Sequence, residues 1–260
     1  MRLAMGIEYD GRRYHGWQAQ RSGVPSVQGA LERALTRVAA HPIEVVCAGR
    51  TDRGVHASAQ VVHFDTTAQR DVRGWMLGTV SHLPEDISVL WVKPVEEDFH
   101  ARFSALAREY RYVLMNRQTR AGLLAGRVTW WHGALDVEAM RRAAMPLLGT
   151  HDFTSFRGKD CQARSPIRTL ERLDISESKG FLYFDVRANA FLHHMVRNLV
   201  GTLLAVGEGR RDENWPLDAL RQRHREAAGI TAPADGLYLV HVEYPEHFNL
   251  KLSPVLPLFG

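Results

Sequence analysis

The 260-residue sequence contains only two cysteines, Cys47 and Cys161, and no long run of apolar residues. Two cysteines this far apart are too few for a disulfide framework or a structural zinc site, so we expect a reducing, cytoplasmic environment. No stretch approaches the roughly 18 uncharged apolar residues of a membrane-spanning helix. The first residues reach Glu8 without an apolar segment of signal-peptide length. Neither export nor membrane insertion is expected.

Several catalytic and cofactor-binding motifs are also missing from the sequence. It has no GxxxxGK[ST] phosphate loop, no GxGxxG after a strand, no GxSxG elbow and no cysteine nucleophile pairing. The 13 histidines have poor spacing for a metal site. His193 and His194 are adjacent on a predicted helix and point about 100° apart, and His56 and His63 fall on opposite sides of a regular strand. We expect neither a cofactor nor a metal.

Lysine is scarce, because arginine supplies 29 of the 33 basic residues, and the formal net charge is +4. A guanidinium group binds phosphate in a bidentate way and stacks on bases, so an arginine-rich surface suits nucleic acid. The same bias can arise from genomic base composition. With 45% hydrophobic and 24% charged residues, the chain has the composition of a folded globular protein. Composition therefore permits an RNA-binding protein without identifying one.

Strands and helices alternate in both halves of the sequence, which predicts an α/β or α+β fold. In the first half we expect strands at residues 2–9, 43–48 and 59–64 and a helix from Ser26 to about residue 40. In the second half we expect strands at 108–115, 170–175, 181–186 and 236–244, and helices at 136–148 and 191–206. The predicted domains are residues 1–105 and 106–245, followed by a tail, 246–260, without an interpretable motif.

Asp52 lies between Arg50 and Arg53 in the connection between two predicted strands. Nearby guanidinium groups favour the charged form of a carboxylate, so Asp52 is a candidate for the reactive group of an enzyme. The alternative is an aspartate that only shapes the turn through hydrogen bonds to its own backbone.

Arg197 and two tyrosines are further candidates. Arg197 flanks the apolar stripe of the helix predicted at 191–206, where a guanidinium needs an acceptor: a backbone carbonyl, Asp52 or another acid. Tyr110 and Tyr112 project to one side of a strand, where they either stack on an RNA base or pack in the core. The loop SFRGKDCQARSPIR, residues 155–168, is rich in basic residues and either follows a phosphate backbone or is a solvated loop.

An ordered series of motifs resembles the tRNA pseudouridine synthase A family across nearly the whole chain. The motifs are YDGRRYHGWQAQ from Tyr9, GRTDRGVHA around Asp52, LPEDI from Leu83, DFHARFSA from Asp98, REYRY from Arg108, HDFTSF from His151, ARSPIRTL from Ala163, FLHHMVRNLVGTLLAVGEG from Phe191 and APADGLYL from Ala232. A series of this length in this order is not expected by chance.

The resemblance implies isomerisation of uridine to pseudouridine at positions 38, 39 and 40 of the tRNA anticodon stem-loop, without a cofactor or metal. The N-glycosidic bond breaks and the base is reattached through C5. Asp52 corresponds to the catalytic carboxylate, and Tyr110, Arg50 and Arg197 to substrate-binding residues. The uridine must swing out of its stack to reach Asp52, with Tyr110 packing on the extruded base. The sequence leaves three roles open for the carboxylate: attack on the sugar C1′, addition to uracil C6, or support of a glycal-type intermediate.

The resemblance also implies a fold and an assembly. The expected fold is a curved mixed or antiparallel sheet built from two ferredoxin-like halves flanked by helices, and the expected assembly is a homodimer with the tRNA bridging both chains. Arg53, Ala59 and Val80 differ from the residues that are common at these places in the family. We expect these differences to affect the positioning of the site or the choice of substrate more than the activity itself. The alternatives are a non-catalytic RNA-binding module and a glycosidic-bond hydrolase. An acid facing RNA favours catalysis over simple binding, because it repels phosphate.

Overall fold

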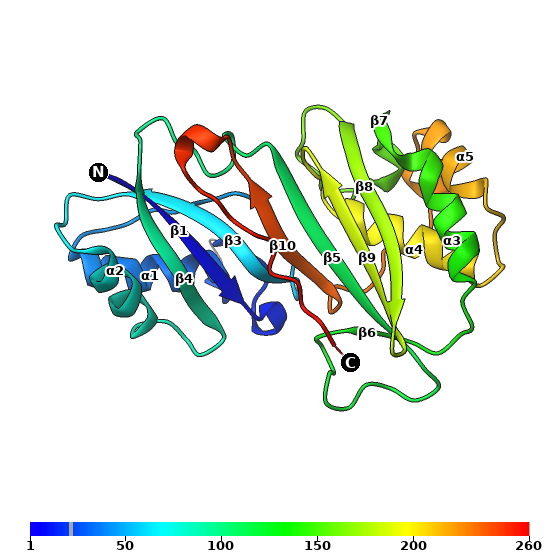
Figure 1. The fold of residues 1–260 in the computed structure, drawn as a ribbon, viewed down its shortest axis with the longest axis horizontal. Coiled ribbons are helices and arrows are strands. Elements are labelled where there is room, and N and C mark those ends of the chain that lie inside the picture. The colour runs from blue at the N-terminus through cyan, green and yellow to red at the C-terminus, as the bar shows by residue number, and fades with distance from the viewer. Residues whose placement is uncertain (21–22, 260) are drawn as a thin grey trace. The chain divides into compact units, whose positions relative to one another are not determined.

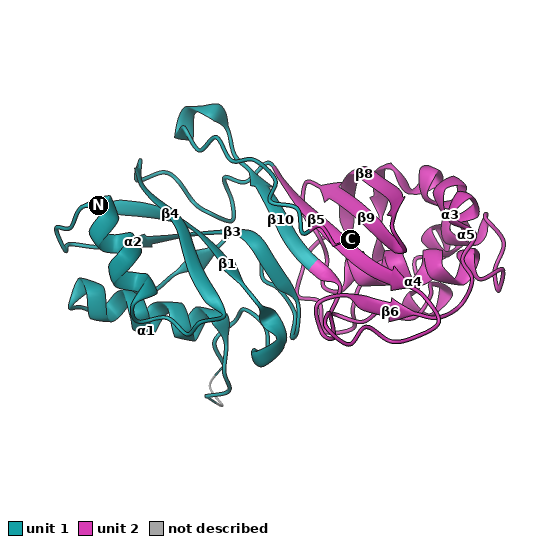
Figure 2. Ribbon diagram, turned by 60° about the horizontal axis from the view of Figure 1, so that its bottom comes forward, with its two compact units in different colours: residues 1–106, 238–257 teal, residues 107–237, 258–260 magenta. Residues whose placement is uncertain are grey.

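The protein is described here from a computed structural model covering residues 1–20 and 23–259 (Figure 1). The chain divides into two compact units (Figure 2). The first contains residues 1–106 and 238–257, and the second contains residues 107–237 and the end of the chain from 258. The predicted division into domains at residue 105, with a tail from 246, stays a prediction. No helix in the described part of the chain is long and apolar enough to cross a membrane.

The sheet of the first unit is largely antiparallel. Its strands β1 (Arg2–Tyr9), β3 (His56–Asp65) and β4 (Ile87–Val95) lie in the order β4-β1-β3. The short β2 (Val46–Cys47) pairs antiparallel with one end of β3, and β10 (Leu237–Glu243) pairs parallel with the other. Helices α1 (Val27–Ala39) and α2 (Val72–Val80) pack on each other, and α2 packs on β4. Elements β1 to β4 thus make a βαββαβ unit of ferredoxin-like strand order.

The second unit has a sheet of the same kind. Strands β5 (Ala107–Asn116), β9 (Phe181–Ala188), β8 (Ile167–Ser178) and β7 (Gly149–Asp152) are antiparallel neighbours in that order, and β6 (Thr129–Trp131) runs parallel to β5. Helices α3 (Val137–Ala144), α4 (Met195–Gly207) and α5 (Trp215–Gln222) pack on one another. The order β5-α3-β8-β9-α4 repeats the pattern of the first unit. The predicted mixed fold of strands and helices is confirmed.

Several local predictions are also confirmed. Strand β1 has the predicted bounds, and Ser26 is the N-cap of α1, where its Oγ accepts from Gly29 N–H at 3.2 Å. The apolar side of α1 is buried as its spacing predicts. Strands β3, β5, β8 and β9 extend beyond their predicted bounds by at most three residues at either end.

Three predicted elements differ from the structure. The strand predicted at 43–48 is reduced to β2, because the amides of Ile43 and Val45 are bound by side chains of α1 rather than by a neighbouring strand. The helix predicted at 136–148 ends as α3 at Ala144 and continues as a 3₁₀ turn that contains Pro146, which has no amide proton to donate. The helix predicted at 191–206 begins only at Met195.

Candidate active site

The loop between β2 and β3 carries Asp52, and buried hydrogen bonds fix the residues before it. Thr51 Oγ1 lies 2.8 Å from the hydroxyl oxygen of Tyr9. The fully buried side chain of Gln60 donates to the carbonyl of Gly49 at 2.6 Å and accepts from the amide of the same residue at 3.4 Å. The strands β1 and β3 therefore hold the backbone of this loop from two sides.

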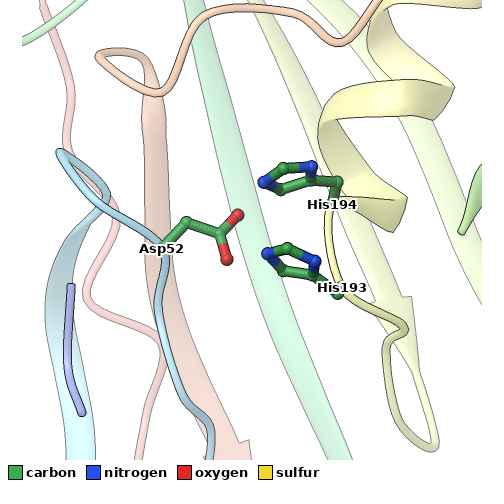
Figure 3. A group of neighbouring side chains, drawn as sticks. All are labelled: Asp52, His193 and His194. Carbon is green, nitrogen blue, oxygen red and sulfur yellow. The ribbon is translucent and has the colours of Figure 1, made fainter. Parts of the chain in front are cut away.

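The Asp52 side chain itself is half-buried and leaves this loop as Figure 3 shows. Arg50 and Arg53 on either side are exposed, whereas Thr51 is buried. The turn after Asp52 closes with a 3.1 Å hydrogen bond from Val55 N–H to the Asp52 carbonyl. The loop thus presents a half-buried carboxylate that is flanked in the sequence by two exposed arginines.

The strand that follows the loop starts at a buried histidine. His56 stacks on Tyr238 of β10, with ring centroids 4.6 Å apart, and its Nδ1 lies 3.3 Å from a carboxylate oxygen of Asp10. Burial raises the pKa of the Asp10 carboxyl, but hydrogen bonds from His56 and Arg12 lower it more, so this pKa lies well below its usual range. Asp10 is therefore a charged partner that holds the end of the loop.

Tyr110 lies on β5 in the second unit and is buried. Its ring meets Phe191 edge to face, with centroids 5.0 Å apart and planes at 83°. Tyr112, two residues along, is fully buried, and its hydroxyl bonds to Thr129 Oγ1 and to the carbonyl of Pro233. Tyr112 therefore has the packing role that was one of the two alternatives for this pair.

Arg197 is the only residue of α4 that is not buried. Its Nε donates to the carbonyl of Ala232 at 2.7 Å, and Ala232 N–H donates back to the Arg197 carbonyl at 3.1 Å. Of the acceptors expected for this guanidinium, a backbone carbonyl is thus one that the structure provides.

His193 and His194 precede α4, so the prediction that they lie on a helix is wrong. His194 has a left-handed backbone with φ of 62°, which lies outside the right-handed helical region, so the helix starts only after it. The two rings lie over each other rather than 100° apart, with centroids 3.8 Å apart (Figure 3). The His193 carbonyl accepts from Gly158 N–H at 2.8 Å, which holds this segment against the loop at 155–168.

The basic residues of the loop at 155–168 are of two kinds. Arg157 donates to the carbonyls of Cys161 and Ala163, and Arg168 donates to carbonyls next to it in the chain. These two side chains therefore organise the loop itself. Lys159 and Arg164 are exposed, so the alternatives of RNA contact and solvation apply to them.

The structure also shows site residues that the sequence analysis missed. In the first unit, Tyr9, Thr51 and Gln60 fix the Asp52 loop. In the second unit, Asn198, which is fully buried next to Arg197, bonds to Phe156, Arg225 and Thr231. The one signal in the sequence was a polar side chain within an apolar run, as for Gln60 in strand β3 and Asn198 in helix α4. Of the predicted residues, Asp52 and Arg50 belong to the first unit and Tyr110 and Arg197 to the second.

Comparison with known proteins identifies the family. The model of the tRNA pseudouridine synthase family matches residues 5–104 and 143–245. A tRNA pseudouridine synthase A of Pseudomonas aeruginosa is 55% identical over 258 residues, which covers 99% of this chain and 90% of that protein. One of Vibrio cholerae is 54% identical over 259 residues, covering 100% of this chain and 98% of that protein.

Among solved structures, one chain of a Cbf5-Nop10-Gar1 complex is similar, with 10% sequence identity and a TM-score of 0.36. The match covers 91% of this chain and 48% of that chain. A similarity this low supports no conclusion here. The family model and the curated relatives together define an RNA-modifying isomerase. The chain belongs to the tRNA pseudouridine synthase family, as its motifs predicted.

Proposed function

We propose that the protein isomerises uridine to pseudouridine at positions 38, 39 and 40 in the anticodon stem-loop of tRNA. The C1′–N1 bond breaks, C1′ bonds to C5, the proton on C5 is lost and N1 gains a proton, so no atom is added overall. Membership of the family supports this reaction, as do the curated relatives named tRNA pseudouridine synthase A.

Asp52 is the proposed catalytic carboxylate. The observation that carries this assignment is the loop around Asp52. Tyr9 bonds to the Thr51 side chain and Gln60 donates to the Gly49 carbonyl, while two exposed arginines flank the carboxylate in the sequence. A carboxylate that is held in place before substrate binds does not need to be ordered during the reaction. A turn residue without a catalytic role would need no such support.

Tyr110, Arg50 and Arg197 are the proposed substrate-binding residues. Tyr110 packs on the extruded uracil, since stacking on an aromatic ring stabilises a base by about 1 to 3 kcal/mol. Arg50 and Arg197 bind phosphate or assist the displacement of the uridine from its stack. Tyr110 is held edge to face by Phe191 and Arg197 by the Ala232 carbonyl, so both side chains are oriented by protein contacts.

The proposal includes a homodimer that bridges one tRNA and acts in the cytoplasm. A chain with only two cysteines, Cys47 and Cys161, agrees with a reducing compartment. Light scattering after size exclusion should give a mass near twice that of one chain, and a monomer would contradict this part of the proposal alone.

The test incubates the purified protein with an unmodified tRNA transcript and maps pseudouridine by carbodiimide-dependent primer-extension stops. The wild type should form stops at positions 38 to 40, and Asp52→Asn should bind the tRNA but form none. Full activity of Asp52→Asn would overturn the role of Asp52. If the wild type bound tRNA without product, the rival reading, a non-catalytic RNA-binding module, would stand instead. Tyr110→Phe keeps the ring and removes the hydroxyl, and so separates stacking from proton transfer.

A further inference from the structure

Asn198 is a buried polar residue that the proposed reaction does not explain. It is fully buried in α4, next to Arg197. Its Nδ2 donates to the Phe156 carbonyl at 2.8 Å, and its Oδ1 accepts from Arg225 Nη2 at 3.0 Å and from Thr231 Oγ1 at 2.6 Å. A buried amide with these partners costs far less than an unpaired one, and its hydrogen bonds fix the groups that it contacts.

The segment that Asn198 holds is the one between α5 and β10, residues 229–232. Arg225 donates to the Gly229 carbonyl at 2.9 Å and to Thr231 Oγ1 at 3.1 Å. The amide of Gly229 donates to Thr202 Oγ1 at 2.9 Å, one turn further along α4. Burial lowers the pKa of Arg225, which donates to the neutral oxygens of Gly229, Asn198 and Thr231. The bonds of Gly229 to Thr202 and of Thr231 to Asn198 thus tie the segment to α4 at two points.

Backbone packing brings the same segment directly against α4. A Cβ placed on Gly201 would lie 1.9 Å from the Ile230 carbonyl oxygen, and one on Gly229 would lie 2.7 Å from the Gly201 carbonyl oxygen. Only glycine permits so close an approach. Ala232, at the end of this segment, donates its N–H to the Arg197 carbonyl at 3.1 Å, so its position is also tied to that of the helix.

We propose that Asn198 is a positioning residue for Arg197, acting through Thr231 and the carbonyl of Ala232. The Ala232 carbonyl accepts from Arg197 Nε and so sets the plane of the guanidinium. The network of Asn198, Arg225 and Thr231 decides where that carbonyl lies. The inference rests on the proposed function, in which Arg197 binds substrate, and it adds a residue that touches no RNA.

The test is a double-mutant cycle between Thr231→Val and Arg197→Lys. Thr231→Val keeps the shape of the side chain and removes only the hydroxyl, which donates to Asn198 and accepts from Arg225. Single-turnover pseudouridine formation and the dissociation constant for an unmodified tRNA transcript are both measured, so that the cycle closes even where Arg197→Lys has no turnover. Thr150→Val is the matched control, because it removes one hydroxyl from a pair with Thr169 on β7 and β8.

We expect Thr231→Val to slow the reaction or weaken tRNA binding about fivefold when Arg197 is present, and less than about twofold in the Arg197→Lys background. Thr150→Val should have no effect on either quantity. Equal effects in both backgrounds, or a lower melting temperature with unchanged kinetics and binding, would overturn the inference. Asn198→Asp, which keeps the acceptor for Arg225 and Thr231, should retain more activity than Asn198→Ala. A wild type without product would instead contradict the proposed function.

Discussion

The position of Asp52 depends on residues that carry no charge. Tyr9 and Thr51 share a buried hydrogen bond, and Gln60 bonds to both the amide and the carbonyl of Gly49. Leaving a buried polar group of this kind unpaired costs about 1 to 3 kcal/mol. The same bonds therefore contribute both to the stability of the first unit and to the placement of the carboxylate.

Tyr9→Phe should lower the turnover rate several-fold while it lowers the free energy of unfolding only slightly. It removes only the hydroxyl that bonds to Thr51 and Gln60, so the free energy of unfolding should fall by about 1 kcal/mol. The turnover rate should fall several-fold, because the Asp52 loop loses one of its restraints. Tyr244→Phe is the control, since it removes an equally buried hydroxyl that donates to the Ala101 carbonyl in the same unit. Equal turnover rates for the two variants would show that Tyr9 does not position the loop.

At the level of single residues, the sequence indicated which side chains belong to the candidate site better than it indicated the groups to which they bond. The helical spacing placed Arg197 at the border of a buried stripe, and the structure has it as the one residue of α4 that is not buried. Its acceptor, Ala232, lies 35 residues away in the chain. No local pattern carries such a contact. For Asp52, the local pattern fitted a turn residue equally well, and the whole-chain resemblance was needed to prefer a catalytic one.

Among the elements of the first unit, α1 was predicted from its apolar period, whereas α2 and the strand β4 were not predicted. Helix α1 has a clear apolar face, whereas α2 was missed, because Gly74 and Gly78 weaken its helical pattern. Gly78 lets α2 pack closely on α1, since a Cβ on it would lie 3.3 Å from a methyl group of Val38. The start of α4 was placed too early, because the apolar residues before it are packed in the core without being helical.

Gly201→Ala should displace the segment at 229–232 from α4. The added Cβ would meet the Ile230 carbonyl oxygen at 1.9 Å, and a backbone atom cannot move away as a flexible side chain does. We expect a loss of about 1 to 3 kcal/mol in stability and a larger loss of activity than the melting temperature explains, because Ala232 moves as well. Gly122→Ala is the control, since nothing lies within 4 Å of its added Cβ. Wild-type kinetics in Gly201→Ala would contradict this account of the segment.

Ala40→Gly should stabilise the protein without changing activity. Ala40 is the C-cap of α1, is exposed and has φ of 59°, a left-handed conformation that costs an alanine about 1 to 2 kcal/mol. Glycine avoids this cost but loses about 0.5 to 1 kcal/mol through its more flexible unfolded chain. The net gain in unfolding free energy, measured in urea, should be about 0.5 to 1 kcal/mol. Ala19→Gly, at an exposed position without positive φ, should give no gain.

Across the whole molecule, stability should depend on pH through groups of the first unit. Burial, aided by the charge of Arg2, lowers the pKa of His63 to about 4 and also lowers that of His100. The hydrogen bond from Arg2 lowers the pKa of Asp65. The histidines cost stability as pH falls below about 6.5, where the unfolded chain takes up protons that the folded chain does not. The Asp65 carboxylate stabilises the fold at any pH above the pKa that it has in the unfolded chain. This contribution is lost as the pH falls through the lower pKa of the folded protein.

His63 gives the clearest test of this pH dependence. Its Nδ1 accepts a hydrogen bond from Ala101 N–H at 3.1 Å, which is made only while that nitrogen carries no proton. Between pH 6.5 and pH 4 the free energy of unfolding should therefore fall by about 1 to 3 kcal/mol in urea titrations. His63→Gln offers an acceptor that does not titrate, and should remove a large part of this fall. His82→Gln, at an exposed histidine, should show the same fall as the wild type. If His63→Gln lost stability as steeply as the wild type over this range, protonation of other groups would have to account for the acid sensitivity.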